Sequence, residues 1–188
     1  IRGNIDEKKY IQKIKNLKNL PEGIENSLKT EEFIEIFAKD FLQAKGSMFL
    51  GRGSSFPIAL EGALKLKELS YLHAEGYPAG EMKHGPLALI EDGLPVIILA
   101  PKDKYFEKTI SNMQEVIARG GKVLLISDKH DEVINENIRF KIEMPSSDEL
   151  LNPFLLTIPL QLLAYHVALL KKCDIDKPRN LAKSVTVE

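Results

Sequence analysis

Short apolar runs alternate with helical segments along the middle of the chain, and this alternation constrains the fold more than any other feature. The runs cover residues 47–50, 94–100, 122–127 and, more weakly, 138–144, while helical spacing marks residues 55–71, 104–118 and 150–172. A strand built from a continuous apolar run is buried on both faces, and strands that alternate with helices are joined by crossovers. The sequence therefore predicts an α/β fold, a three-layer α/β/α sandwich around an open, mainly parallel sheet.

Residues 1–45 have a different character and are expected to form a helical lead-in that packs on the domain. Pro21 interrupts the first helical pattern, and Thr30 is expected to cap a second helix that ends near Ala44. We expect the domain proper to span residues 46–175 and the aperiodic residues 176–188 to form a tail. The first pattern is carried by Ile5, Ile11, Ile14, Leu17 and Leu20.

Charge and cysteine content exclude several classes of protein. The 188 residues hold 26 basic and 27 acidic side chains, so the basic excess expected of a nucleic-acid-binding protein is missing. The single cysteine, Cys173, cannot form an internal disulfide, which favours a reducing, cytoplasmic location. Polar residues and prolines break the apolar region 150–170, so no membrane span is expected. Because the chain begins with Ile1 rather than Met, we expect a fragment of a longer protein.

A glycine- and serine-rich turn follows the first apolar run. In open parallel sheets, ligands bind beyond the carboxyl ends of the strands, and the turn Gly51-Arg52-Gly53-Ser54-Ser55 lies at such an end. Its hydroxyls and the following helix N-terminus can receive an anion, which makes Arg52, Ser54 and Ser55 candidate substrate-binding residues. The alternative is an ordinary turn in which Ser54 or Ser55 caps the helix. The turn matches neither the dinucleotide fingerprint nor the P-loop.

The helix predicted over residues 55–71 carries a stripe of charges. It is apolar nearly all round, so it is expected to be largely buried. At helical spacing, Glu61, Lys65 and Glu68 fall in a stripe about 60° wide. One interpretation is a ladder of ion pairs, each worth a few tenths of a kcal/mol. The other is a catalytic carboxylate that moves protons beside a lysine that stabilises a developing enolate.

Titratable groups are also dense just after this helix, in residues 73–75 and 80–86, which are expected to form a loop or short helix. A metal site is one hypothesis, because His73, Glu75, Glu81 and His84 are of metal-ligating types. Neither an H-E-x-x-H nor a C-x-x-C pattern supports it, so no metal and no cofactor is predicted. His84 is instead a candidate for acid–base chemistry or hydrogen bonding.

Three blocks of sequence resemble the glutamine–fructose-6-phosphate aminotransferases (isomerising), also called glucosamine-6-phosphate synthases. The blocks are Glu61-Gly62-Ala63-Leu64-Lys65-Leu66-Lys67-Glu68, His73-Ala74-Glu75 with Lys83-His84-Gly85-Pro86, and the tail from Pro178 to Glu188. In that family a glutaminase domain precedes two sugar isomerase (SIS) subdomains. The resemblance covers most of the chain and implies that it is the second SIS subdomain plus the C-terminal tail. The glutaminase domain and the first SIS subdomain are absent, so we expect the fragment alone to be inactive.

The resemblance implies a role for each matching residue. Glu68 is the base that moves a proton between C1 and C2 of fructose 6-phosphate, and Lys65 stabilises charge on the intermediate. Lys183 forms the Schiff base with the open-chain ketose. His84 assists ring opening across the interface of a homodimer, and Glu61 belongs to the same polar stripe. The resemblance also implies that the product of the intact enzyme is glucosamine 6-phosphate.

Two other functions remain open at this stage. A related SIS enzyme that deaminates or deglycates amino-sugar phosphates would keep Glu68 and a histidine base without a glutaminase domain. A non-catalytic SIS module that binds a sugar phosphate would need neither Glu68 nor Lys183. The near-neutral charge and the intact tail argue against a DNA-binding regulator of this kind.

Overall fold

The computed structural model describes residues 5–128, 132–133 and 135–181. The α-helices are α1 (Glu7–Lys18), α2 (Leu20–Leu28), α3 (Glu31–Ala38), α4 (Ser55–Ser70), α5 (Phe106–Ile117) and α6 (Asn152–Leu170). Short 3₁₀ helices are η1 (Lys39–Phe41), η2 (Ala79–His84) and η3 (Pro86–Leu89). The strands are β1 (Gly46–Gly51), β2 (His73–Pro78), β3 (Pro95–Leu99), β4 (Lys122–Ser127) and β5 (Phe140–Glu143).

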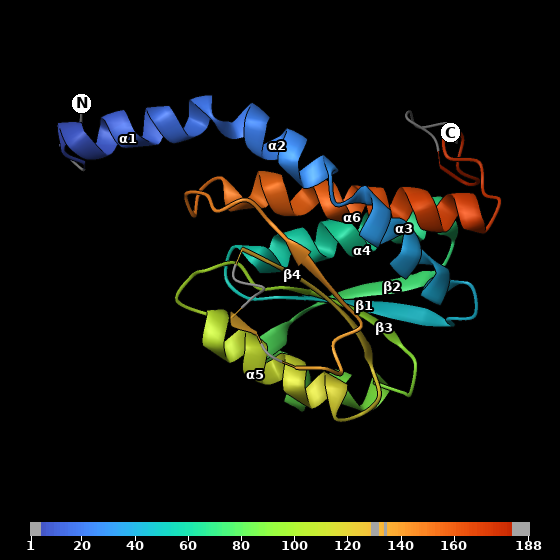
Figure 1. The fold of residues 1–188 in the computed structure, drawn as a ribbon. Helices are drawn as coiled ribbons and strands as arrows, with labels where there is room; N and C mark the ends of the chain where they lie inside the picture. The colour runs from blue at the N-terminus through green and yellow to red at the C-terminus, as the bar shows by residue number, and fades with distance from the viewer. Residues whose placement is uncertain (1–4, 129–131, 134, 182–188) are drawn as a thin grey trace, which may run out of the picture.

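The five strands form one parallel sheet in the order β2-β1-β3-β4-β5. Because the chain starts in the middle at β1 and moves outward on both sides, helices cover both faces. Figure 1 shows α4 and α6 above the sheet and α5 below it. The predicted three-layer α/β/α architecture is confirmed.

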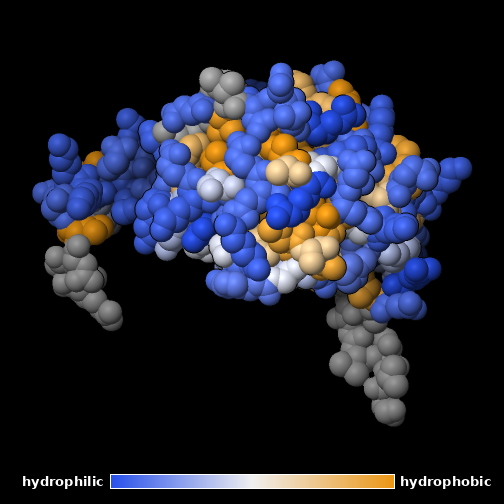
Figure 2. All heavy atoms as spheres, turned by 90° about the horizontal axis from the view of Figure 1, so that it is seen from below, coloured by the Kyte–Doolittle hydropathy of each residue, from blue (hydrophilic) through white to orange (hydrophobic). Residues whose placement is uncertain are grey.

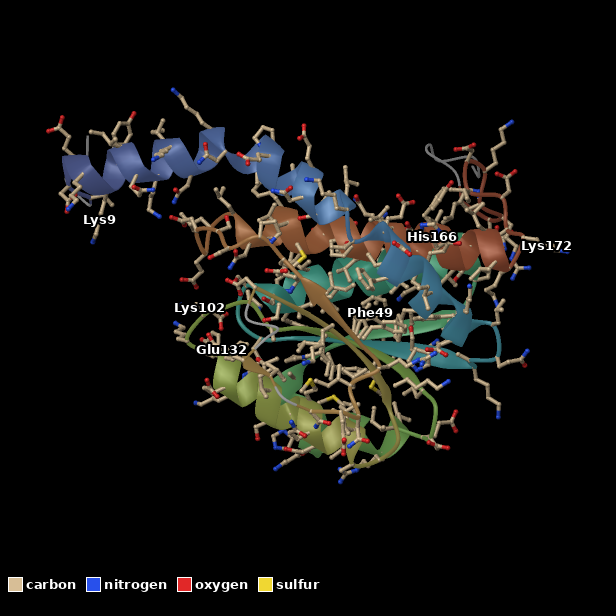
Figure 3. The ribbon with its side chains drawn as sticks, in the orientation of Figure 1. Lys9, Phe49, Lys102, Glu132, His166 and Lys172 are labelled. Carbon is tan, nitrogen blue, oxygen red and sulfur yellow. The ribbon has the colours of Figure 1, made fainter. Side chains whose placement is uncertain are left out.

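Alternate residues of the strands face two separate cores. Phe49 points to the side of α4 and α6, whereas its neighbours Met48 and Leu50 point to the side of α5. Figure 3 shows Phe49 between the sheet and α4. All five residues of β3 are buried, as expected for a central parallel strand that is covered on both faces.

Residues 73–75 were expected in a loop or short helix, and that expectation is wrong, because His73–Pro78 form edge strand β2. The strand pairs with β1 on one side only, so no continuous apolar run is needed to bury it. Gly76 gives β2 its close approach to α4, since a Cβ there would lie 2.9 Å from the Cα of Leu60.

The lead-in differs from the prediction at its second helix. Thr30 precedes α3, but its hydroxyl donates to the carbonyl oxygen of Ser27 at 2.7 Å and accepts no hydrogen bond from the first turn of α3. The helix ends at Ala38, and η1 replaces its expected last turn. Helix α1 buries no residue, and Figures 1 and 2 show it standing off the body of the molecule.

Helix α6 is long and apolar enough to cross a membrane by length and composition alone. Half of its apolar stretch is buried inside the fold, and Leu160 packs against Gly62 of α4. Core helices of globular domains have this same composition. Proline 159 lies within α6, where it is itself buried.

Candidate active site

The stripe of charges predicted on α4 is present and closely paired. Lys65 Nζ lies 2.8 Å from Glu68 Oε2 and 3.8 Å from Glu61 Oε1. The hydrogen bond from Lys65 to Glu68 is the main cause that raises the pKa of Lys65, and burial opposes it. Lys65 is therefore a fixed positive charge at neutral pH. About a quarter to two-fifths of each side chain is exposed, so the stripe borders solvent rather than the sealed core.

A cavity of about 830 Å³ opens beside this pair. Lys65 and Glu68 line it from α4, and the segment that follows α6 lines it from the other side. That segment contributes Ile175, Asp176, Lys177, Pro178 and Leu181. The arrangement places a carboxylate and an ammonium group at the wall of a space large enough for a small polar substrate. Lys183 lies outside the described residues, two positions beyond Leu181.

The end of α4 carries a contact that sequence reasoning missed. Tyr71 caps the helix in the left-handed region, with φ 59° and ψ 16°, where a bulky residue costs roughly 1–2 kcal/mol and glycine is preferred. Its Oη accepts a hydrogen bond of 2.8 Å from the backbone N–H of Arg179. The Arg179 guanidinium lies 4.1 Å from the centroid of its ring. The two residues are 108 positions apart in the sequence, so no local sequence pattern indicated their contact.

Part of the apolar surface of α4 also differs from the expectation. Leu60 and Leu64 are 45% and 39% exposed, although the helix was expected to be largely buried. The face formed by Ala59, Gly62, Ala63 and Leu66 is buried against the sheet and α6. The described residues of this chain thus leave one apolar face of α4 uncovered next to the charged stripe.

The turn between β1 and α4 lies far from this cavity. Arg52, Ser54 and Ser55 are at the start of α4, about 20 Å along the helix from Glu68. Arg52 Nη1 donates to Asn112 Oδ1 at 3.2 Å. Ser55 is 1% exposed, and its Oγ has no hydrogen-bond partner within the described part of the chain. Neither Ser54 nor Ser55 caps the helix through its side chain, although Ser54 occupies the cap position.

His84 is also separate from the Lys65–Glu68 pair in sequence and in its contacts. It ends η2, is 74% exposed, and its Nδ1 lies 2.7 Å from Glu81 Oε2. The other two metal candidates form their own pair on β2, with His73 Nε2 3.3 Å from Glu75 Oε1. In the described ranges, no three His, Cys, Asp or Glu side chains are grouped as a metal site would require.

His166 has a structural partner. Its Nε2 lies 3.0 Å from Glu31 Oε1, which links α6 to α3, and Figure 3 shows it at that helix contact. The histidine is 8% exposed. A hydrogen-bonded histidine between two packed helices needs no catalytic explanation.

Comparisons with known proteins agree with the fold. Residues 40–171 match the SIS domain family. The whole chain is 52% identical to the glutamine–fructose-6-phosphate aminotransferase [isomerizing] of Bartonella quintana, and 93% of it is 51% identical to that of Aquifex aeolicus. The chain spans about 31% and 30% of the lengths of these relatives.

Two solved structures are similar. The C-terminal domain of glucosamine-fructose-6-phosphate aminotransferase from Francisella tularensis has a TM-score of 0.88 and 43% identity, over 92% of this chain and 49% of that one. Glucosamine-6-phosphate deaminase from Thermotoga maritima has a TM-score of 0.68 and 29% identity, over 91% of this chain and 48% of that one. The resemblance stated from the sequence is confirmed, and the chain belongs to the SIS domain family.

Proposed function

We propose that this chain is the C-terminal half of the isomerase part of a glutamine–fructose-6-phosphate aminotransferase. The intact enzyme converts fructose 6-phosphate and glutamine-derived ammonia to glucosamine 6-phosphate. The observation that carries the proposal is the Lys65–Glu68 pair on the wall of a cavity that the C-terminal segment borders. The 52% identity over the full chain supports the same activity.

In the proposed mechanism each residue acts on a stated atom of the sugar. The Lys183 amine attacks C2 of the open-chain ketose, and loss of water gives a Schiff base. Ammonia then displaces the Lys183 amine and leaves an imine at C2. The Glu68 carboxylate removes a proton from C1 and returns one to C2. With net transfer of the C1 hydroxyl proton to the imine nitrogen, C1 becomes the aldehyde and C2 carries the amine of the product. The ammonium group of Lys65 stabilises the negative charge that develops between these steps. Glu61 holds Lys65 from the other side.

We place the enzyme in the cytoplasm as a homodimer, in which His84 reaches the partner's site and assists ring opening. The high exposure of His84 leaves its ring accessible to a second subunit. Arg52, Ser54 and Ser55 remain candidate substrate-binding residues, although α4 separates them from Glu68. The fragment alone is expected to be inactive, because the first SIS subdomain supplies most of the sugar-phosphate pocket.

The test uses the full-length protein with fructose 6-phosphate in deuterated water. NMR follows deuterium entry at C1, and a coupled assay follows glucosamine 6-phosphate formed with glutamine. Glu68→Gln is expected to lower exchange by about 10²–10⁴-fold. Glu61→Gln should have a smaller effect, and Lys67→Gln, on the exposed side of α4, should match the wild type. Exchange that survives Glu68→Gln unchanged would overturn the assignment of the base.

A deaminase is the second candidate, since the Thermotoga maritima structure shares both fold and 29% identity. A deaminase would release ammonia from glucosamine 6-phosphate and would not need glutamine. The same full-length protein incubated with glucosamine 6-phosphate decides between the two. Ammonia release without any glutamine-dependent synthesis would favour the deaminase, and neither reaction with intact binding would favour a non-catalytic module.

A further inference from the structure

Tyr71 adopts a backbone conformation that an aromatic residue seldom takes. Its left-handed φ of 59° ends α4 two residues before β2 begins. Glycine would adopt this conformation with less strain. Strained positions persist where the surroundings hold them, and they gather at functional sites. The contacts that keep Tyr71 in this conformation are therefore a guide to its function.

The side chain of Tyr71 contacts a single residue of the C-terminal segment in two ways. Its hydroxyl oxygen accepts from the backbone N–H of Arg179, and its ring faces the Arg179 guanidinium. The first contact fixes the path of the main chain, and the second fixes the side chain. Both would be lost if the helix ended in glycine.

The segment on either side of this contact borders the cavity of the proposed active site. Pro178 precedes Arg179, Leu181 follows it, and both line the cavity with Lys65 and Glu68. Upstream, the Oδ1 of Asp174 accepts from the backbone N–H groups of Asp176 and Lys177, which turns the chain back after α6. The segment is thus held at two points, first by Asp174 and then by the contact between Tyr71 and Arg179.

Chain length connects this fixed point to the proposed nucleophile. Lys183 is four residues beyond Arg179. Four residues extend at most about 14 Å, so the contact limits where the Lys183 amine can go. We propose that Tyr71 and Arg179 form a clamp that holds the C-terminal segment at Arg179 beside the cavity, and that Lys183, four residues further along the sequence, acts on the substrate from this anchor. This inference rests on the proposed function and makes both clamp members positioning residues.

The experiment compares variants of the full-length protein. Tyr71→Gly removes the clamp and relieves the backbone strain, whereas Tyr71→Phe keeps the ring for the Arg179 contact. Lys172→Gly is the matched control, because Lys172 also has a left-handed φ, 55°, and lies outside the clamp. Thermal unfolding is measured for each variant, together with kcat and KM for fructose 6-phosphate. Borohydride trapping reports the Schiff base at Lys183, and C1 exchange reports Glu68.

Tyr71→Gly is expected to unfold no earlier than the wild type but to lose about tenfold to a hundredfold in kcat and in trapping. Its KM should stay near the wild-type value, whereas its C1 exchange should fall with the trapping, because the proton leaves C1 only after Lys183 has formed the Schiff base. Tyr71→Phe should retain most of the trapping, because the ring that contacts Arg179 remains. Arg179→Lys should lose the trapping, because lysine lacks the planar guanidinium that lies on the Tyr71 ring. Lys172→Gly should keep the trapping of the wild type.

Two results would overturn the inference in different ways. If Tyr71→Gly traps substrate and turns over like the wild type while C1 exchange still depends on Glu68, the clamp is wrong and the proposed function stands. If the wild type itself neither exchanges at C1 nor traps substrate, the proposed function and the clamp fail together.

Discussion

Gly62 of α4 faces Phe49 of β1 so closely that an added Cβ would lie 2.9 Å from the ring carbon Cδ1. The same Cβ would lie 2.7 Å from Leu160 Cδ1 of α6. The helix that carries the charged stripe is therefore wedged between the sheet and α6 at a position without a side chain. Its place in the fold, and with it the place of Lys65 and Glu68, depends on this glycine.

Gly62→Ala is expected to lower the free energy of unfolding by about 1–2 kcal/mol. Overpacking against a ring and a leucine exceeds the gain of up to about 1 kcal/mol in helix propensity. Urea denaturation measures the change. Gly23→Ala in α2 is the matched control, because its nearest neighbour is a flexible Leu155 methyl at 3.1 Å. A Gly62→Ala protein more stable than the wild type would contradict the wedge.

The free energy of unfolding should depend on pH through the carboxylate of Asp148. The backbone N–H of Leu150 and the Lys13 ammonium hold the pKa of Asp148 below its ordinary value. A lowered folded-state pKa gives stability that is present above the unfolded pKa and is lost as pH falls through the folded one. The difference in unfolding free energy between wild type and Asp148→Asn should thus be full at neutral pH and shrink below about pH 4.

Lys13→Met separates the two interactions that lower the pKa of Asp148. It removes the ammonium group and leaves the hydrogen bond from the Leu150 backbone in place. This variant should keep part of the acid dependence that Asp148→Asn removes. Denaturant titrations at several pH values provide the comparison. An unchanged pH profile in Asp148→Asn would show that the carboxylate contributes nothing.

Lys65 should be a slow target for acylation. Its raised pKa leaves less of the neutral amine at any given alkaline pH, and only the neutral amine reacts. Lys67, exposed on the same helix, is the internal reference. Limited acetylation followed by peptide mapping should label Lys67 first, and Glu68→Gln should speed the labelling of Lys65. Equal rates in both proteins would argue against the pairing.

Tyr77 should ionise late in an alkaline titration. Its hydroxyl donates to the Glu75 carboxylate, and this hydrogen bond is the main cause that raises the pKa of Tyr77 above its ordinary value. Glu75→Gln offers a neutral, weaker acceptor, so the pKa of Tyr77 should fall back toward about 10. Tyrosinate absorbance measures the shift, with Tyr77→Phe identifying the signal. A Glu75→Gln titration identical to the wild type would contradict the pair.

The apolar runs predicted the central strands because β3 and β4 are buried on both faces, and burial of that kind is visible in composition. Strand β2 was missed for the opposite reason. It lies at the sheet edge and meets α4 through Ala74 and Gly76, so His73, Glu75 and Tyr77 can be polar. An edge strand can be apolar on one face alone, whereas the prediction relied on runs that are apolar on both faces.

For the candidate site, helical periodicity was sufficient to bring Glu61, Lys65 and Glu68 together. It could not show that Leu60 and Leu64 are exposed, because that depends on what packs against the helix rather than on the helix itself. The contact between Tyr71 and Arg179 was equally hidden, since it joins two distant segments and leaves no local pattern.

The wedged position of α4 also decides how the charged stripe responds to heat. The amide hydrogens around Ala63 and Leu66 belong to the most buried part of the chain. Such amides exchange with solvent only when the whole domain opens. Lys65 and Glu68 are carried by this same backbone, so their separation should persist up to the global unfolding transition, and loss of the pair on heating should coincide with that transition instead of preceding it.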